Sequence, residues 1–97
     1  MHEASVTRDI VRHIEQVAAE RGARCVVGVK IVLGPLSGFS ANSLRQHLIH
    51  DAEGTVAQGA SIEVQIAGDV HELDALEGLN TSGVLLESIV LGTGEEW

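Results

Sequence analysis

The chain has 97 residues, 44% of them hydrophobic but only 2% aromatic, with one cysteine and a formal net charge of −8. A single cysteine excludes both an internal disulfide framework and a zinc site made of paired cysteine thiolates, so this small domain must fold by aliphatic packing. Most of the acidic charge lies in residues 46–97, which hold ten acidic residues and no Lys or Arg; such a surface disfavours nucleic acid and suits a cation or a basic partner.

The start of the chain lacks the features of a signal peptide. Residues 1–9 contain no apolar core and carry Glu3 and Asp9 where a signal peptide is cationic. The apolar run at residues 25–33 is interrupted by Lys30 and is far too short to cross a bilayer. We therefore expect a cytoplasmic protein that does not insert into a membrane.

Residues 5–21 have the pattern of an amphipathic helix. Apolar residues recur three and four positions apart with charged residues between them, which places one apolar stripe against a core. These residues are Val6, Ile10, Ile14, Val17 and Ala18. Ser5 is the expected N-cap, and Gly22 is expected to end the helix because glycine tolerates the left-handed conformation found there.

Residues 24–33 are predicted to form the central strand of a sheet. They are rich in β-branched residues and almost continuously apolar, and they are bounded by Gly22 and by Gly34. Cys25 lies at the start of this run. We expect it to be a small buried hydrophobic residue rather than a reactive thiolate.

A second helix is predicted after the segment that contains the single proline. Ser40 fits the N-cap position, and Phe39 and Leu44 have the spacing of a hydrophobic staple. The helix is expected to continue through Ala52 and to stop at Gly54.

The remainder of the chain is predicted to supply two strands. In residues 61–67, three apolar residues alternate with polar ones, which is typical of a strand with one wet face. They are Ile62, Val64 and Ile66. Residues 84–91 form the last strand. Between the two strands, residues 69–83 are acidic and weakly periodic, and we expect an excursion with at most one helical turn at residues 71–76.

The predicted order of elements is therefore α-β-α-β-β. Two amphipathic helices need a common apolar surface, and a single sheet can bury both stripes. The sequence thus predicts the α+β class, with two helices packed on one face of a three-stranded mixed sheet in one domain spanning residues 1–97.

The sequence gives no indication of catalysis. It contains no arrangement of a nucleophile with histidine and a carboxylate, no phosphate-binding loop and no zinc-protease motif. Acidic residues such as Glu72 and Asp74 lie in the excursion, where solvation explains them. We therefore predict that the protein is not an enzyme.

The first three residues, Met1, His2 and Glu3, form a candidate metal site. The bulk of His2 is expected to prevent removal of Met1. The α-amine, the His2 amide nitrogen and the His2 imidazole can then form adjacent chelate rings, and the amide or carboxylate of Glu3 can supply a fourth donor. Planar coordination rich in nitrogen favours Ni(II) or Cu(II) over Zn(II). A frayed terminus that binds no metal is the alternative, since short motifs match by chance.

A second candidate is His47-x-x-His50 with Asp51 on the second predicted helix. Residues three apart are neighbours on a helix surface, so both imidazoles could bind one ion. Solvated histidines are the alternative, because no third fixed ligand is evident. His13 and His71 are interpreted as surface residues.

Several short motifs occur in a specific order along the chain. They are Met1-His2-Glu3, Val29-x-Ile31-x-Leu33-Gly34-x-Leu36-Ser37-Gly38, Ser43-Leu44-Arg45, Ala52-Glu53-Gly54-Thr55-x-Ala57-x-Gly59-Ala60-x-Ile62-Glu63, and the closing strand at residues 84–91. In this order they resemble the HypA/HybF family of nickel metallochaperones, and the resemblance covers nearly the whole chain.

The resemblance implies a HypA-like protein that binds Ni(II) transiently during maturation of [NiFe]-hydrogenase and, in some organisms, urease. It implies a HypB-like GTPase and a nickel-enzyme precursor as partners. It also implies that His2 is the principal nickel ligand, beside the Met1 amine and Glu3. Association with a second copy of the chain stays open.

The chain departs from the family in one respect. Family members carry a zinc module with two Cys-x-x-Cys pairs between the second and last strands, where this chain has residues 69–83 and no cysteine. We therefore expect a HypA-like nickel-binding domain without zinc. Two alternatives stay open: a metal-free interaction or adaptor module that keeps the fold, and an enzyme or small-molecule-binding subunit that uses the acidic excursion.

Overall fold

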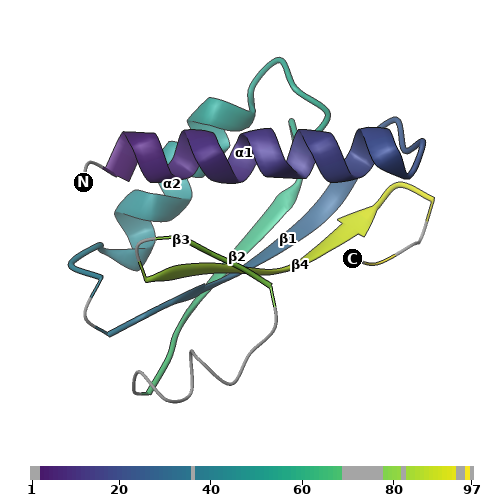
Figure 1. Cartoon of the computed structure of the whole chain (residues 1–97). Coiled ribbons are helices and arrows are strands. Elements are labelled where there is room, and N and C mark those ends of the chain that lie inside the picture. Colours follow the sequence, from purple (N-terminus) through teal and green to yellow (C-terminus); the bar gives the residue numbers. More distant parts are fainter. Residues whose placement is uncertain (1–2, 36, 69–77, 82, 94–95, 97) are drawn as a thin grey trace.

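The computed structural model describes residues 3–35, 37–68, 78–81, 83–93 and 96. In this part of the chain, two helices cover one face of a sheet with strand order β2-β1-β4-β3 (Figure 1). The sheet is mixed, because β1 pairs with β2 in parallel and with β4 antiparallel. The predicted α+β architecture is confirmed, and the sheet has one short strand more than predicted.

Helix α1 spans Glu3–Glu20. Its apolar stripe is buried as predicted, and Ile10 and Ile14 are at most 2% exposed. The prediction of Ser5 as N-cap is wrong: the helix begins two residues earlier, since Glu and Ala are good helix formers. The predicted end is confirmed. Gly22 has φ of +66°, and the Ala23 amide donates to the Ala18 carbonyl at 2.9 Å, which is the hydrogen bond of a Schellman motif.

Strand β1 spans Val26–Leu33 and lies between β2 and β4, as expected of the central strand. Its start differs from the prediction in one important respect. Cys25 precedes the strand and is exposed, so the expectation of a buried cysteine is wrong. The Cys25 carbonyl accepts from the Gly92 amide at 2.9 Å; the backbone here is held while the side chain faces outward. An irregularity in the pairing with β4 between Val26 and Gly28 also leaves Val27 50% exposed.

Helix α2 spans Ala41–Ala52 and begins as predicted. The Ser40 hydroxyl accepts from the Ser43 amide at 3.2 Å, which satisfies one of the free donors at the helix start. Phe39 and Leu44 both pack into the main core, as the staple requires. Gly54 follows with φ of +79°, so the predicted end is confirmed as well.

Strand β2 spans Ser61–Ile66 at one edge of the sheet. Ile62 and Val64 pack against the core, but Ile66 is 65% exposed and departs from the predicted alternation. The alternation predicts which face of the sheet a residue lies on, but not whether other elements cover that face. Ile66 is exposed because the end of β2 projects beyond the helices (Figure 1). Ala67 instead packs with Val32 and Leu85 in a second, small cluster.

Strand β4 spans Val84–Leu91, which matches the prediction, and β3 spans Leu79–Thr81 and pairs antiparallel with β4. β3 lies within the segment expected to be an excursion without a strand. Gly78 precedes it with φ of +144°, and a Cβ at this position would collide with the Leu86 carbonyl oxygen. The predicted helical turn at residues 71–76 lies outside the described residues.

The main core is aliphatic and joins both helices to the inner face of the sheet. Among the described residues, Thr7 is the one polar side chain in the fully buried class, at 0% exposure. A hydroxyl in such a core needs a hydrogen-bond partner. That partner lies on α2 and fixes the relation between the two helices.

Candidate functional site

The start of α1 is tied to the end of α2 by a partly buried hydrogen bond. Thr7 Oγ1 lies 2.6 Å from Asp51 Oδ2 and 3.2 Å from the Ala4 carbonyl oxygen. A hydroxyl has one proton, and the shorter distance together with the carboxylate charge favours donation to Asp51. The contact therefore fixes the second turn of α1 against the last turn of α2.

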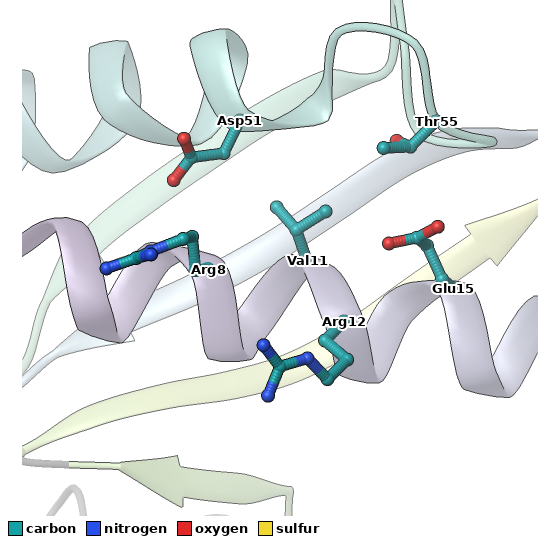
Figure 2. Close-up of a pocket in the computed structure, with 6 residues that line it drawn as sticks. All are labelled: Arg8, Val11, Arg12, Glu15, Asp51 and Thr55. Carbon is teal, nitrogen blue, oxygen red and sulfur yellow. The ribbon is translucent and has the colours of Figure 1, made fainter.

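A groove of about 300 Å³ runs between the two helices beyond this contact (Figure 2). It is lined by Arg8, Val11, Arg12, Glu15, Asp51 and Thr55. Arg8 and Asp51 lie at one end, and Glu15 and Thr55 lie at the other, so α1 and the chain through the end of α2 run in the same direction. The groove has charges of both signs, and it is not a uniform site for an anion or a cation.

The structure describes one of the three residues of the predicted terminal metal site. Glu3 is the first residue of the helix, while Met1 and His2 lie outside the described residues. The first backbone N–H groups of a helix have no acceptor within it. The Glu3 amide therefore donates no hydrogen bond within the helix. A role as a nitrogen ligand requires such a free amide.

The structure separates the three residues of the second predicted metal site, His47, His50 and Asp51, into two groups. His47 and His50 are both exposed and line the same hollow of about 300 Å³ together with Ser43 and Gln46. Asp51 instead faces α1, where it accepts from Thr7. The structure thus brings the two imidazoles together and separates the carboxylate from them.

Two of the other residues considered from the sequence, His13 and Cys25, lie in the described part of the chain. His13 is half-buried, and Cys25 is exposed. His71, Glu72 and Asp74 lie outside the described residues. Within the described ranges, no group of three or more His, Cys, Asp or Glu side chains is placed to hold a metal ion.

No sequence motif indicates Thr7 or its contact with Asp51. Thr7 follows Val6 in the first helix and resembles any polar residue beside an apolar stripe. Only the position of α2 in the fold shows that α2 covers the side of α1 that carries Thr7. Across residues 3–35, 37–68, 78–81 and 83–93, no helix is both long enough and apolar enough to cross a membrane.

Comparison with known proteins agrees with this architecture and with the sequence motifs. Residues 1–71 match the family model described as "Hydrogenase/urease nickel incorporation, metallochaperone, hypA". Hydrogenase maturation factor HypA of Nitrosospira multiformis is 33% identical over 67 residues, covering 69% of this chain and 58% of the relative. HypA of Methanopyrus kandleri is 36% identical over 66 residues, covering 68% of this chain and 46% of the relative. The chain therefore spans roughly half the length of these curated relatives.

The solution structure of the Ni metallochaperone HypA from Helicobacter pylori has the same fold. Its TM-score is 0.63 with 16% sequence identity, over 100% of this chain and 92% of that one. Fold and sequence together place the chain in the class of small α+β domains related to metallochaperones. More specifically, the chain belongs to the HypA family.

Proposed function

We propose that the protein is a non-catalytic, cytoplasmic carrier that binds Ni(II) through Met1, His2 and Glu3 and delivers it during maturation of nickel enzymes. The match of residues 1–71 to the nickel-incorporation family carries the proposal, because it includes the terminal tripeptide itself. By the same resemblance, the recipient is a [NiFe]-hydrogenase precursor or urease, and a HypB-like GTPase is the partner.

The proposed coordination follows from the donors that the tripeptide contains. The Met1 amine, the His2 amide nitrogen and the His2 imidazole supply three nitrogen atoms in adjacent rings, and Glu3 supplies the fourth donor. Nitrogen-rich planar sites suit Ni(II) and Cu(II). If both amides lose their protons, the complex carries no net charge at the metal, which the positive end of α1 tolerates better than a bare dication.

A site made of a chain end also suits transfer to another protein. Its donors can be replaced one at a time, whereas a closed cage must open as a whole. We propose that this nickel site functions without zinc, because the segment at residues 69–83 contains none of the cysteines that a zinc module needs. Cu(II) is expected to compete in vitro, since it forms more stable complexes than Ni(II) with the same donors.

The alternative is a metal-free adaptor that keeps the fold and binds a partner protein. One observation favours it: β2 is an edge strand that presents Ile66 with 65% of its surface exposed. Exposed apolar residues beside unpaired strand edges are common at interaction sites.

Calorimetric titration with Ni(II) distinguishes the two functions. We would compare untagged protein beginning at Met1, the His2→Ala variant and a form extended by Gly-Ser before Met1. The carrier proposal expects the two altered proteins to lose at least 100-fold in affinity for the terminal site. Equal binding by all three would reject the terminal site, and no binding by any of them would favour the adaptor.

A further inference from the structure

The exposed flank of α2 carries two imidazoles that share one hollow. His47 and His50 are three residues apart, both are exposed, and both line the space bounded by Ser43 and Gln46. A spacing of i and i+3 brings two side chains of one helix to the same ion in carboxylate-bridged metal bundles, where glutamate and histidine are ligands at this spacing. The spacing and the shared hollow thus allow both imidazoles to reach one ion.

The helix that carries the pair is held in place from its opposite side. Leu44 and Leu48 are at most 1% exposed and belong to the main core, and Ser40 caps the first turn. Little backbone freedom is lost when an ion binds to such a helix, because its fold is already fixed. The two imidazoles therefore need to order only their own side-chain torsions.

The local charge also favours a cation at this position. His50 lies in the last turn of α2, where the helix dipole is negative. Arg45, the one cationic Lys or Arg side chain of α2, is directed toward β2, where its Nε donates to the Ile62 carbonyl at 3.2 Å. Asp51, one residue beyond His50, adds negative charge while its Oδ2 is occupied by Thr7.

We propose that His47 and His50 together bind one divalent transition-metal ion that prefers nitrogen ligands, such as Ni(II) or Cu(II), at a second site separate from the amino terminus. Imidazole nitrogens are suitable ligands for both ions. Two protein donors leave the remaining coordination positions to water, so the ion exchanges readily. The site does not require the terminal one to exist.

The position of this site gives it a further property. Thr7 and Asp51 fix α1 and α2 to each other, and α2 crosses α1 obliquely near this contact (Figure 1). Glu3 lies four residues before Thr7, and His47 lies four residues before Asp51, which is about one helical turn in each case. The second site is therefore carried by a helix that is fixed to the first turns of α1.

Titration of the Gly-Ser-extended protein with Ni(II) at pH 7.5 tests the proposal, because the extension removes the free α-amine from the terminal chelate. We expect one site, with at least a tenfold loss of affinity in each of His47→Gln and His50→Gln. His71→Gln is the matched control and is expected to bind as the parent does. The far-UV circular dichroism of the His47→Gln and His50→Gln variants is expected to be unchanged, since both of these side chains are exposed.

Nuclear magnetic resonance of the imidazole groups gives a second readout. Substoichiometric Ni(II) should broaden the signals of His47 and His50 before those of His13 and His71, because a paramagnetic ion acts on its nearest nuclei. Absence of binding to the extended protein, or affinity that neither α2 substitution changes, would overturn the proposal. If the extension has no effect while both α2 substitutions abolish binding, the α2 site stands and the terminal site fails.

Discussion

Thr7 Oγ1 donates to Asp51 Oδ2 at 2.6 Å and joins the two helices through the one fully buried polar side chain of the described residues. Hydrogen bonds to a carboxylate are shorter and stronger than neutral ones, and a carboxylate that loses its donor in a partly buried position is costly. This contact sets the position of the start of α1, and with it the place from which the terminal ligands extend.

Replacement of Thr7 by Val, which has nearly the same shape, removes the donor and leaves the Asp51 carboxylate half-buried without it. We expect a loss of about 1–3 kcal/mol in the free energy of unfolding, measured by urea denaturation. A double-mutant cycle with Asp51→Asn provides the control, and a coupling energy near zero would show that the hydrogen bond does not stabilise the fold.

The affinity of the terminal site for Ni(II) should fall as pH decreases from 7.5 to 6. An α-amine with an ordinary pKa of about 7.8 and an imidazole with one of about 6.5 must both lose a proton to bind, so protons compete with the metal. These two groups alone predict a decrease on the order of 100-fold, and each amide nitrogen that loses its proton on binding makes the decrease larger. Calorimetry in a non-coordinating buffer measures it. A flat profile in untagged protein would contradict the use of the α-amine.

Substitution of Gly78 by Ala should weaken the pairing of β3 with β4. The added Cβ collides with the Leu86 carbonyl oxygen, and φ of +144° is itself unfavourable for alanine. We expect a loss of roughly 2 kcal/mol or more in the free energy of unfolding and faster amide exchange in β3. Gly38→Ala is the matched control, because Gly38 also has a positive φ but open space around its Cβ position. Equal effects of the two substitutions would mean that the collision is relieved without cost.

Two adjacent residues of α2 should differ sharply in their contribution to stability. Leu48 is 1% exposed in the main core, whereas Ile49 is 39% exposed. Leu48→Ala is expected to cost about 2–5 kcal/mol, and Ile49→Ala should cost less than about 1 kcal/mol. Urea denaturation of both variants measures the difference, and similar losses would contradict the packing of α2 described above.

The helix ends could be predicted from the sequence where local chemistry determines them. Ser40 and Gly22 act through neighbouring backbone groups, so a few residues contain the whole signal. Strand β3 depends on pairing with β4 and on the close approach permitted by Gly78, and a three-residue strand has too little alternation to be recognised. The exposure of Ile66 depends on where the helical layer ends, which no local pattern encodes.

The candidate sites were predictable to different degrees. Spacing alone identified His47 and His50 as neighbours, because helix geometry fixes that relation. The same reasoning grouped Asp51 with them, but contact with Thr7 directs this carboxylate toward α1. The donors of the terminal tripeptide follow from its chemistry, and their geometry around an ion stays a prediction.

Strands β2 and β3 are the two edge strands of the sheet, and one connection joins them along the chain. The pairing of β1 with β2 and with β4 involves no residue of this connection. The entropic penalty of a flexible connection grows only with the logarithm of its length, by about 0.6 kcal/mol for each doubling. The connection between β2 and β3 can thus change in length or sequence during evolution while the two helices and the inner strands keep their arrangement. The family match ends at residue 71, inside this same connection, where a change of sequence is expected to lower the stability of the fold least.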